Sequence, residues 1–153
     1  MKITEVEIID SEIGKNVKII KPVNIYRCQI EDNVFIGPFV EVQEGVRIGK
    51  NTRIQSHTFI CSGVEVLENC FIGHGVMFIN DLFINGGPAN NNKLLWRKTK
   101  INNNVSIGSN STILPVNICS GVVIGAGSVV TKDILVKGYY AGNPARLLKV
   151  IES

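Results

Sequence analysis

The side chains best suited to acid–base chemistry at neutral pH are the only two histidines of the chain, His57 and His74. Histidine is the usual general base in this range because its ordinary pKa lies close to neutrality. A second polar cluster, Asn80 and Asp81, adds a carboxamide and a carboxylate side by side. Surface histidines and an Asn-Asp turn that satisfies its own backbone are the structural alternatives to a chemical role.

The elements that must position these residues follow from a six-residue repeat. A branched aliphatic residue recurs at every sixth position, at Ile30, Ile36, Val42, Ile48, Ile54, Ile60, Val66 and Ile72. Four places after each lies a small or β-branched residue. A helix of 3.6 residues per turn would scatter these aliphatic residues around its circumference, and a single strand would require alternation at two. The pattern therefore predicts an all-β fold, a β-helix of short strands and turns.

Three hexads form one triangular coil, so about sixteen hexads predict about five coils, stacked at the roughly 4.8 Å spacing of neighbouring strands. The repeat is lost across residues 81–98, which predicts one inserted loop, and the C-terminal segment 146–151 is expected to cap the last coil. At this length we expect a single domain over residues 1–153.

The repeat also places the two histidines relative to each other. His57 and His74 both fall at turn corners of their hexads. They lie 17 residues apart, which is close to one coil of 18. We therefore expect them on adjacent coils at nearly the same corner.

Composition narrows the function classes. The chain is 44% hydrophobic but only 7% aromatic, which suits a narrow core of Ile and Val layers. A net charge of +3 indicates neither a nucleic-acid stripe nor a basic membrane surface. No apolar stretch approaches the roughly 20 residues of a membrane helix, so a cytoplasmic location is expected. The four cysteines lack CxxC pairing, which favours reduced, structural thiols.

Several hexads resemble those of the left-handed β-helix, or hexapeptide-repeat, acyltransferases. The matching motifs are Ile36-Gly37, Ile48-Gly49, Ile72-Gly73, Ile107-Gly108, the run 124–130 and the closing segment 141–146. Members of this family are typically homotrimers that use acetyl-CoA. The resemblance therefore implies a left-handed winding, acetyl-CoA as the cosubstrate, a homotrimer with sites at subunit interfaces, and no metal.

The segment 73–81, followed by a loop, is similar to the nucleotide-linked 3-amino-sugar N-acetyltransferases. Its Phe-Ile-Asn-Asp form at 78–81 resembles enzymes that act on dTDP-3-amino-3,6-dideoxyhexoses. Enzymes acting on UDP-linked 3-amino uronic acids are the alternative. Either substrate class implies direct attack of the amine on the thioester.

The resemblance assigns roles around the reacting amine, which must be held within about 3–3.5 Å of the thioester carbonyl carbon. Asn80 is expected to hold the amine or the carbonyl, and Asp81 to bind a sugar hydroxyl. His57 and His74 are the candidate bases, with the departing CoA thiolate as an alternative proton acceptor. Glu65 and Trp96 are further substrate-binding candidates, for which an exposed turn and loop anchoring are the alternatives.

The resemblance also implies a cofactor-binding set. Small residues let the backbone approach the pantetheine arm closely, and the candidates are Gly108, Gly125, Ala126 and Gly127. The closing segment contributes Asn143, Pro144 and Arg146. Lys132 and Arg146 could meet the CoA phosphates, although solvated surface charge is the plainer interpretation.

Two other function classes share the predicted fold. A γ-type carbonic anhydrase needs three histidines per metal ion, whereas this chain has two unless neighbouring chains combine their ligands. A non-enzymatic β-helix scaffold would not need the inserted loop with Asn80 and Asp81.

Overall fold

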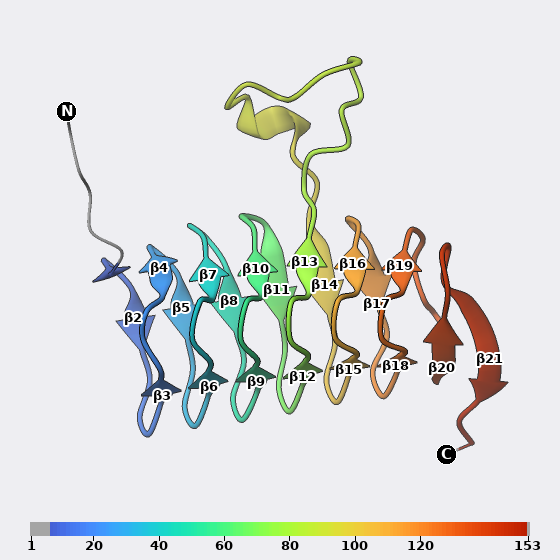
Figure 1. Cartoon of the computed structure of the whole chain (residues 1–153), viewed down its shortest axis with the longest axis horizontal. Helices are drawn as coiled ribbons and strands as arrows, with labels where there is room; N and C mark the ends of the chain where they lie inside the picture. Colours follow the sequence, from blue (N-terminus) through green and yellow to red (C-terminus); the bar gives the residue numbers. More distant parts are fainter. Residues whose placement is uncertain (1–6, 153) are drawn as a thin grey trace.

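The computed structural model describes residues 7–152 and shows a left-handed parallel β-helix of triangular section. Its coils are stacked along one axis, from the N-terminal to the C-terminal end (Figure 1). Three sheets form the sides of the prism, and the strands within each are two to five residues long. The predicted fold class is confirmed.

The three sheets take their strands in regular succession along the chain. Sheet A contains β1 (Ile8–Ile9), β4 (Asn24–Tyr26), β7 (Glu41–Val42), β10 (Phe59–Ile60), β13 (Met77–Phe78), β16 (Thr112–Ile113) and β19 (Val129–Val130). Sheet B contains β2 (Glu12–Ile13), β5 (Gln29–Ile30), β8 (Arg47–Ile48), β11 (Val64–Val66), β14 (Thr99–Ile101) and β17 (Asn117–Ile118). Sheet C contains β3 (Lys18–Ile19), β6 (Phe35–Ile36), β9 (Arg53–Ile54), β12 (Phe71–Ile72), β15 (Ser106–Ile107), β18 (Val123–Ile124), β20 (Gly138–Ala141) and β21 (Arg146–Val150).

The coil count differs from the predicted five. Sheet A alone has seven strands, so the prism has about seven coils. Each coil takes 17 or 18 residues, since Ile13 pairs with Ile30 and Ile30 with Ile48. The prediction was low because the first coils, from Ile8 to Ile25, depart from the six-residue phase yet still pair in register.

The repeated aliphatic residues form the core. In the two-residue strands the second residue points inward, so Ile60 is fully buried while Phe59 beside it is half-buried on the outer face of sheet A. Equivalent aliphatic residues stack directly above one another, as Ile36, Ile54 and Ile72 do in sheet C. Every coil thus covers the apolar surface of the next.

The three corners of the prism are named by the sheets that they join. At the B–C corner, Asn16, Asn33, Asn51 and Asn69 all adopt left-handed φ angles of 55–59°. Their carboxamides form a column, with Nδ2 to Oδ1 distances of 3.3, 3.1 and 3.0 Å between successive coils. Asparagine tolerates this backbone region better than most residues, so it serves both the turn and the contact between coils.

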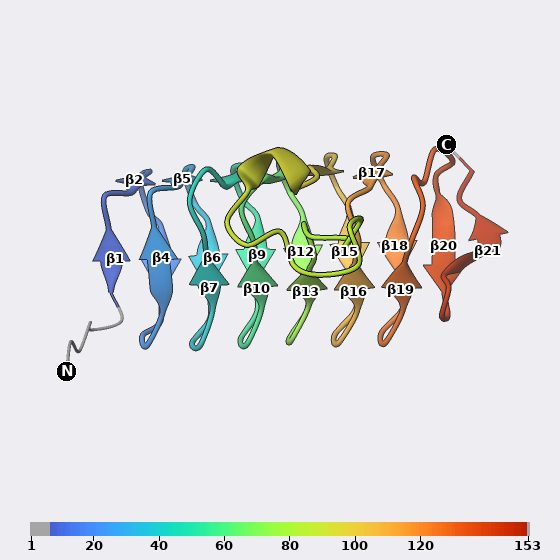
Figure 2. The same ribbon diagram turned by 90° about the horizontal axis from the view of Figure 1, so that it is seen from above.

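The predicted loop leaves the prism at the A–B corner, between β13 and β14 (Figure 1). Its one regular element is the short 3-10 helix η1 (Lys93–Leu95). Seen from above, the loop and η1 lie over the coils rather than beyond an end of the prism (Figure 2). With only three residues, η1 leaves residues 7–152 without any helix that could cross a membrane.

The C-terminal cap is the hairpin of β20 and β21. These two strands pair antiparallel, with a register shift between Tyr139 and Tyr140, and they end sheet C. The hairpin brings residues 142–145 back to the last coil, where the Ala145 N–H donates to the Val129 carbonyl at 2.8 Å.

We expect Ile60→Ala to destabilise the protein strongly, because it opens a cavity in a fully buried layer of the central coils. Such truncations cost about 2–5 kcal/mol. The measurement is the midpoint of urea unfolding followed by circular dichroism. Ile84→Ala is the control, because Ile84 is 50% exposed in the loop and its truncation should change stability by less than about 0.5 kcal/mol. Equal midpoints for the two variants would contradict the layered-core account.

Candidate active site at the C–A corner

The C–A corner gathers both histidines and the predicted small-residue cofactor segment. Backbone hydrogen bonds connect its successive coils: the Gly75 N–H donates to the Ser56 carbonyl, the Asn110 N–H to His74, and the Gly127 N–H to Ser109, at 2.8–2.9 Å. His74 therefore lies one coil from Asn110 and two coils from Gly127. One continuous edge of the prism carries a candidate base and a candidate cofactor track.

His74 is held in a defined orientation. Its Nδ1 lies 2.9 Å from the Ser56 hydroxyl of the preceding coil, and its backbone N–H donates to Ser109 Oγ at 3.2 Å. When Ser56 accepts from Nδ1–H, the imidazole Nε2 carries the free lone pair. The ring is exposed at the corner, so Nε2 can act as a base toward a bound ligand.

His57 lies one coil earlier at the same corner, as the sequence predicts, but one residue out of step with His74. Its coil neighbours are Phe39 on one side and Gly75 on the other, and all three have left-handed φ angles of 60–65°. The imidazole is stacked on the Phe39 ring, with centroids 4.8 Å apart and planes inclined by 28°. His57 is therefore part of an aromatic platform rather than a second copy of the His74 arrangement.

The predicted cofactor residues lie along the next coils of this corner. Gly108 packs so closely on the following coil that an added Cβ would lie 2.8 Å from Ala126 Cα. Ala126 and Gly127 are exposed, and no heavy atom lies within 4 Å of the Cβ position of Gly127. Gly125, buried against Ala141, connects β18 to these two residues. The backbone there is open to an extended ligand.

The closing segment lies beside this track. The Gly142 N–H donates to Ser128 Oγ at 3.3 Å, which places Asn143 and Pro144 in the hairpin turn next to the last coil of the corner. Arg146 begins β21 and is exposed, with its guanidinium donating to the Ala145 carbonyl at 3.1 Å. The structure thus brings this segment and the corner glycines together.

Lys132 and Glu65 lie elsewhere. Lys132 follows β19 on the far edge of sheet A and does not approach the C–A corner. Glu65 sits in strand β11 rather than in the turn considered as an alternative, and its carboxylate pairs with Arg47 and Lys100, each at 3.5 Å. These pairs place Glu65 in a charged row on sheet B, away from the histidines.

Asn80 and Asp81 form the base of the inserted loop. Asn80 Nδ2 donates to the Ser62 carbonyl of the preceding coil at 2.9 Å, and its own carbonyl accepts from the Arg97 N–H at 2.9 Å. Asp81 accepts from the backbone N–H groups of Phe83 at 3.0 Å and Ala89 at 2.7 Å. Both side chains therefore organise the loop, as the structural alternative expected.

Trp96 lines a groove between the loop and the prism. The groove, of about 260 Å³, is bordered by Glu44, Gly45, Ser62, Gly63, Lys93, Trp96, Arg97 and Lys98. Lys93 Nζ closes one end through an ion pair with Glu44 at 3.1 Å. Trp96 is half-buried there, which agrees with loop anchoring and leaves part of its ring open to a ligand.

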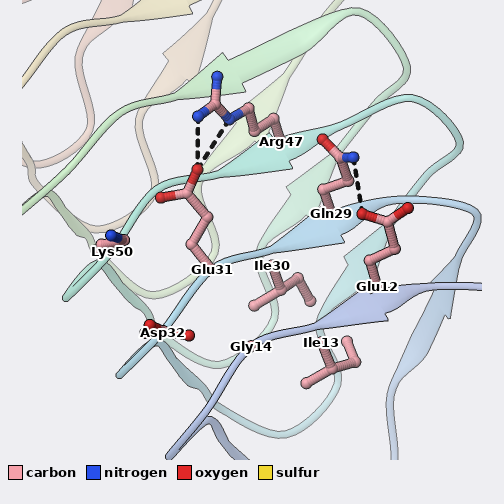
Figure 3. Close-up of a pocket in the computed structure, with 9 residues that line it drawn as sticks. All are labelled: Glu12, Ile13, Gly14, Gln29, Ile30, Glu31, Asp32, Arg47 and Lys50. Carbon is pink, nitrogen blue, oxygen red and sulfur yellow. Dashed lines mark hydrogen bonds and ion pairs between the residues drawn. The ribbon is translucent and has the colours of Figure 1, made fainter.

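The largest hollow, about 350 Å³, lies between sheets B and C and contains none of the predicted site residues (Figure 3). Its polar side chains satisfy one another. Arg47 donates to Glu31 through Nε and Nη2, at 3.0 and 2.6 Å, and Gln29 donates to Glu12 at 2.9 Å (Figure 3). Size alone therefore does not identify the site. Within residues 7–152, no three His, Cys, Asp or Glu side chains gather in a metal-binding arrangement.

Comparison with known proteins tests the expected family. Residues 27–62 match the bacterial transferase hexapeptide family, and residues 98–132 match the hexapeptide repeat of succinyl-transferase. AntD, an N-acyltransferase from Bacillus cereus crystallised with dTDP and coenzyme A, is 31% identical, with a TM-score of 0.80 over 94% of this chain and 85% of that chain. The chain belongs to the hexapeptide-repeat acyltransferases.

Other relatives of this hexapeptide-repeat acyltransferase are more distant or match in part. A maltose O-acetyltransferase from Clostridium difficile 630 is 26% identical, with a TM-score of 0.66 over 93% of this chain and 70% of that chain. The putative acetyltransferase YvoF from Bacillus subtilis strain 168 is 44% identical over 52 residues, or 33% of this chain. The matched segment covers 30% of YvoF, so the chain aligns with less than a third of that curated relative's length.

Three residues of the acyltransferase corner were missed from the sequence. Ser56 and Ser109 fix His74, and Phe39 stacks on His57. The spacing held a signal for two of them, because Ser56 lies 18 residues before His74 and Phe39 lies 18 residues before His57. Such pairs share a place on adjacent coils.

We expect Asp81→Ala to loosen the inserted loop, because two backbone N–H groups lose their acceptor. A loss of about 1.4 kcal/mol in local stability would raise tryptic cleavage at Lys93, Arg97 and Lys98 about tenfold. The rate is read by mass spectrometry under native conditions. Asn85→Ala, an exposed change in the same loop, should leave the rate unchanged. Equal rates for both variants would show that Asp81 does not hold the loop.

Proposed function

We propose that this protein is an acetyl-CoA-dependent N-acetyltransferase that acetylates an amino group of a dTDP-linked amino sugar. The observation that carries the proposal is the C–A corner, where a fixed histidine base adjoins an open track of small residues. The similarity to AntD, which was crystallised with dTDP and coenzyme A, supports this ligand pair. Within this class, the 3-amino group of a 3,6-dideoxyhexose is the expected acceptor.

The chemistry needs few groups. The amine nitrogen attacks the acetyl carbonyl carbon, a C–N bond forms, and the C–S bond breaks as the CoA thiolate leaves. The proton lost by the amine passes to His74 Nε2 and then to the thiolate, so amide and free thiol are the products. Ser56 keeps the imidazole in the required tautomer through the 2.9 Å contact with Nδ1. The Gly125 to Gly127 segment positions the thioester.

The site is proposed to be completed between subunits of a homotrimer. His74 and Asn80 flank β13 on opposite edges of sheet A, so one chain does not bring them together. The outer face between them is largely apolar at Phe59, Met77 and Val129, which suits contact with a neighbouring chain. A closed trimer would then set the C–A corner of one subunit beside the loop base of another.

The first test is thiol release from acetyl-CoA with three acceptors: a dTDP-3-amino-3,6-dideoxyhexose, its 4-amino isomer, and a UDP-linked 3-amino uronic acid. We expect the highest kcat/KM with the dTDP-linked 3-amino sugar. Ellman's reagent can follow the reaction because burial raises the pKa of Cys61 to about 12 and also raises those of Cys28 and Cys70. A blank without acceptor corrects for Cys119. No thiol release with any amino sugar nucleotide would refute the proposed function.

The second test is complementation between inactive subunits. We expect His74→Ala to lower kcat about 10²-fold or more, as loss of a general base does. Asn80→Ala should lower it at least about tenfold, or about 1.4 kcal/mol. If each site takes His74 from one chain and Asn80 from another, co-expressed His74→Ala and Asn80→Ala chains should recover about a quarter of wild-type activity by random assembly.

The control for this test is the doubly substituted chain co-expressed with wild type. There every site formed by wild-type neighbours stays active, so the wild-type fraction alone predicts the rate. Activity of the two-variant mixture no higher than the mean of the separate variants would place the whole site within one chain. Light scattering should report three chains per particle in each preparation.

A further inference from the structure

A second hollow lies at the N-terminal end of the same corner. It has a volume of about 280 Å³ and is lined by Pro22, Val23, Asn24, Phe39, Val40 and Glu41. Its lining is mostly apolar, with polar groups only at the sheet A side, where Asn24 and Glu41 are the first residues of β4 and β7. An apolar slot with a few polar groups at one side is the usual form of a site for a flat, partly polar ligand.

Phe39 is the distinctive wall of this hollow. Its φ angle is 60°, a region that bulky residues rarely occupy and that costs about 1–3 kcal/mol. The side chain gains little burial in return, since it is 58% exposed. One face of the ring is covered by the His57 imidazole. The strained backbone therefore presents an aromatic surface to solvent, which stability alone does not explain.

The polar end of the hollow can recognise the edge of a nucleobase. The Asn24 carboxamide offers both a donor and an acceptor, which matches the adjacent carbonyl and N–H groups of a pyrimidine. Glu41 is held in place by Gln43, whose Nε2 donates to Glu41 Oε1 at 2.9 Å. Glu41 thus adds a fixed acceptor beside Asn24.

The distance to the candidate base fits a sugar nucleotide. Phe39 and His57 are on adjacent coils, and His74 is on the next, so Phe39 and His74 are separated along the axis by about two strand spacings, or about 10 Å. A ribose and a diphosphate span a distance of this order between base and sugar. The pantetheine track at Gly125 to Gly127 lies on the other side of His74, so the two ligands would meet there.

We propose that the hollow beside Phe39 binds the pyrimidine base of the sugar nucleotide, stacked on the Phe39 ring and recognised at its edge by Asn24. The assignment rests on the proposed function, and it adds a nucleoside site two coils from His74. It leaves Trp96, across sheet A, as an anchor of the inserted loop.

The test is isothermal titration of the full-length protein with dTDP, UDP, GDP and coenzyme A. Base–aromatic stacking contributes about 1–3 kcal/mol per base, so Phe39→Leu should weaken dTDP binding about tenfold or more, while Phe39→Tyr should retain it. Asn24→Ala should weaken dTDP and UDP binding. Coenzyme A affinity should stay within about twofold of wild type in all three variants.

Phe83→Leu is the matched control, because Phe83 is also an exposed phenylalanine, at 59%, with a left-handed φ of 51°. It should bind dTDP as wild type does. Unchanged dTDP affinity in Phe39→Leu, or a loss in Trp96→Ala instead, would overturn the nucleoside site and leave the proposed function intact. GDP binding at least as tight as dTDP would also overturn it. Failure of wild type to bind both coenzyme A and every nucleotide would refute the proposed function itself.

Discussion

The register between coils is the constraint on which the rest of this structure depends. Each coil must return to the same place after 17 or 18 residues, because Ile54 must stack between Ile36 and Ile72 to remain dry. A slip of one residue would turn every inward side chain to solvent. The corners therefore repeat at fixed positions, and residues far apart in sequence form straight columns. The His74 environment is one such column, built from Ser56, His74 and Ser109.

The corners differ in how they meet the same backbone demand. Each needs a residue in the left-handed region, and at the B–C corner asparagine supplies it while its carboxamide stabilises the next coil. At the C–A corner, Phe39 and His57 take the equivalent places, and their rings stack instead. Stability alone would favour asparagine or glycine at both. Strained, exposed rings at one corner mark that corner as the functional edge.

Much of the fold could be predicted from the sequence, because hydrophobic periodicity directly encodes which residues face inward. The repeat from Ile30 to Ile72 predicted the winding and the break after Phe78. The first coils escaped the count because strand pairing tolerates a five-residue corner that breaks the six-residue phase, as between Ile25 and Ile30. The site was harder. The ion pairs of Glu65 and the backbone contacts of Asp81 depend on side-chain direction and loop path, which residue spacing does not contain.

The inserted loop has a consequence for how this protein can change over time. Val64 pairs with Thr99 although 35 residues separate them, about twice the usual coil, so the loop consumes one coil's length of chain without shifting any later register. Closing a longer segment adds little entropy penalty, since each doubling of loop length costs only about 0.6 kcal/mol. Insertions at this corner are therefore nearly neutral for the prism. Loops of other lengths and chemistries can be exchanged there by recombination, so that acceptor preference diversifies while the core sequence stays the same.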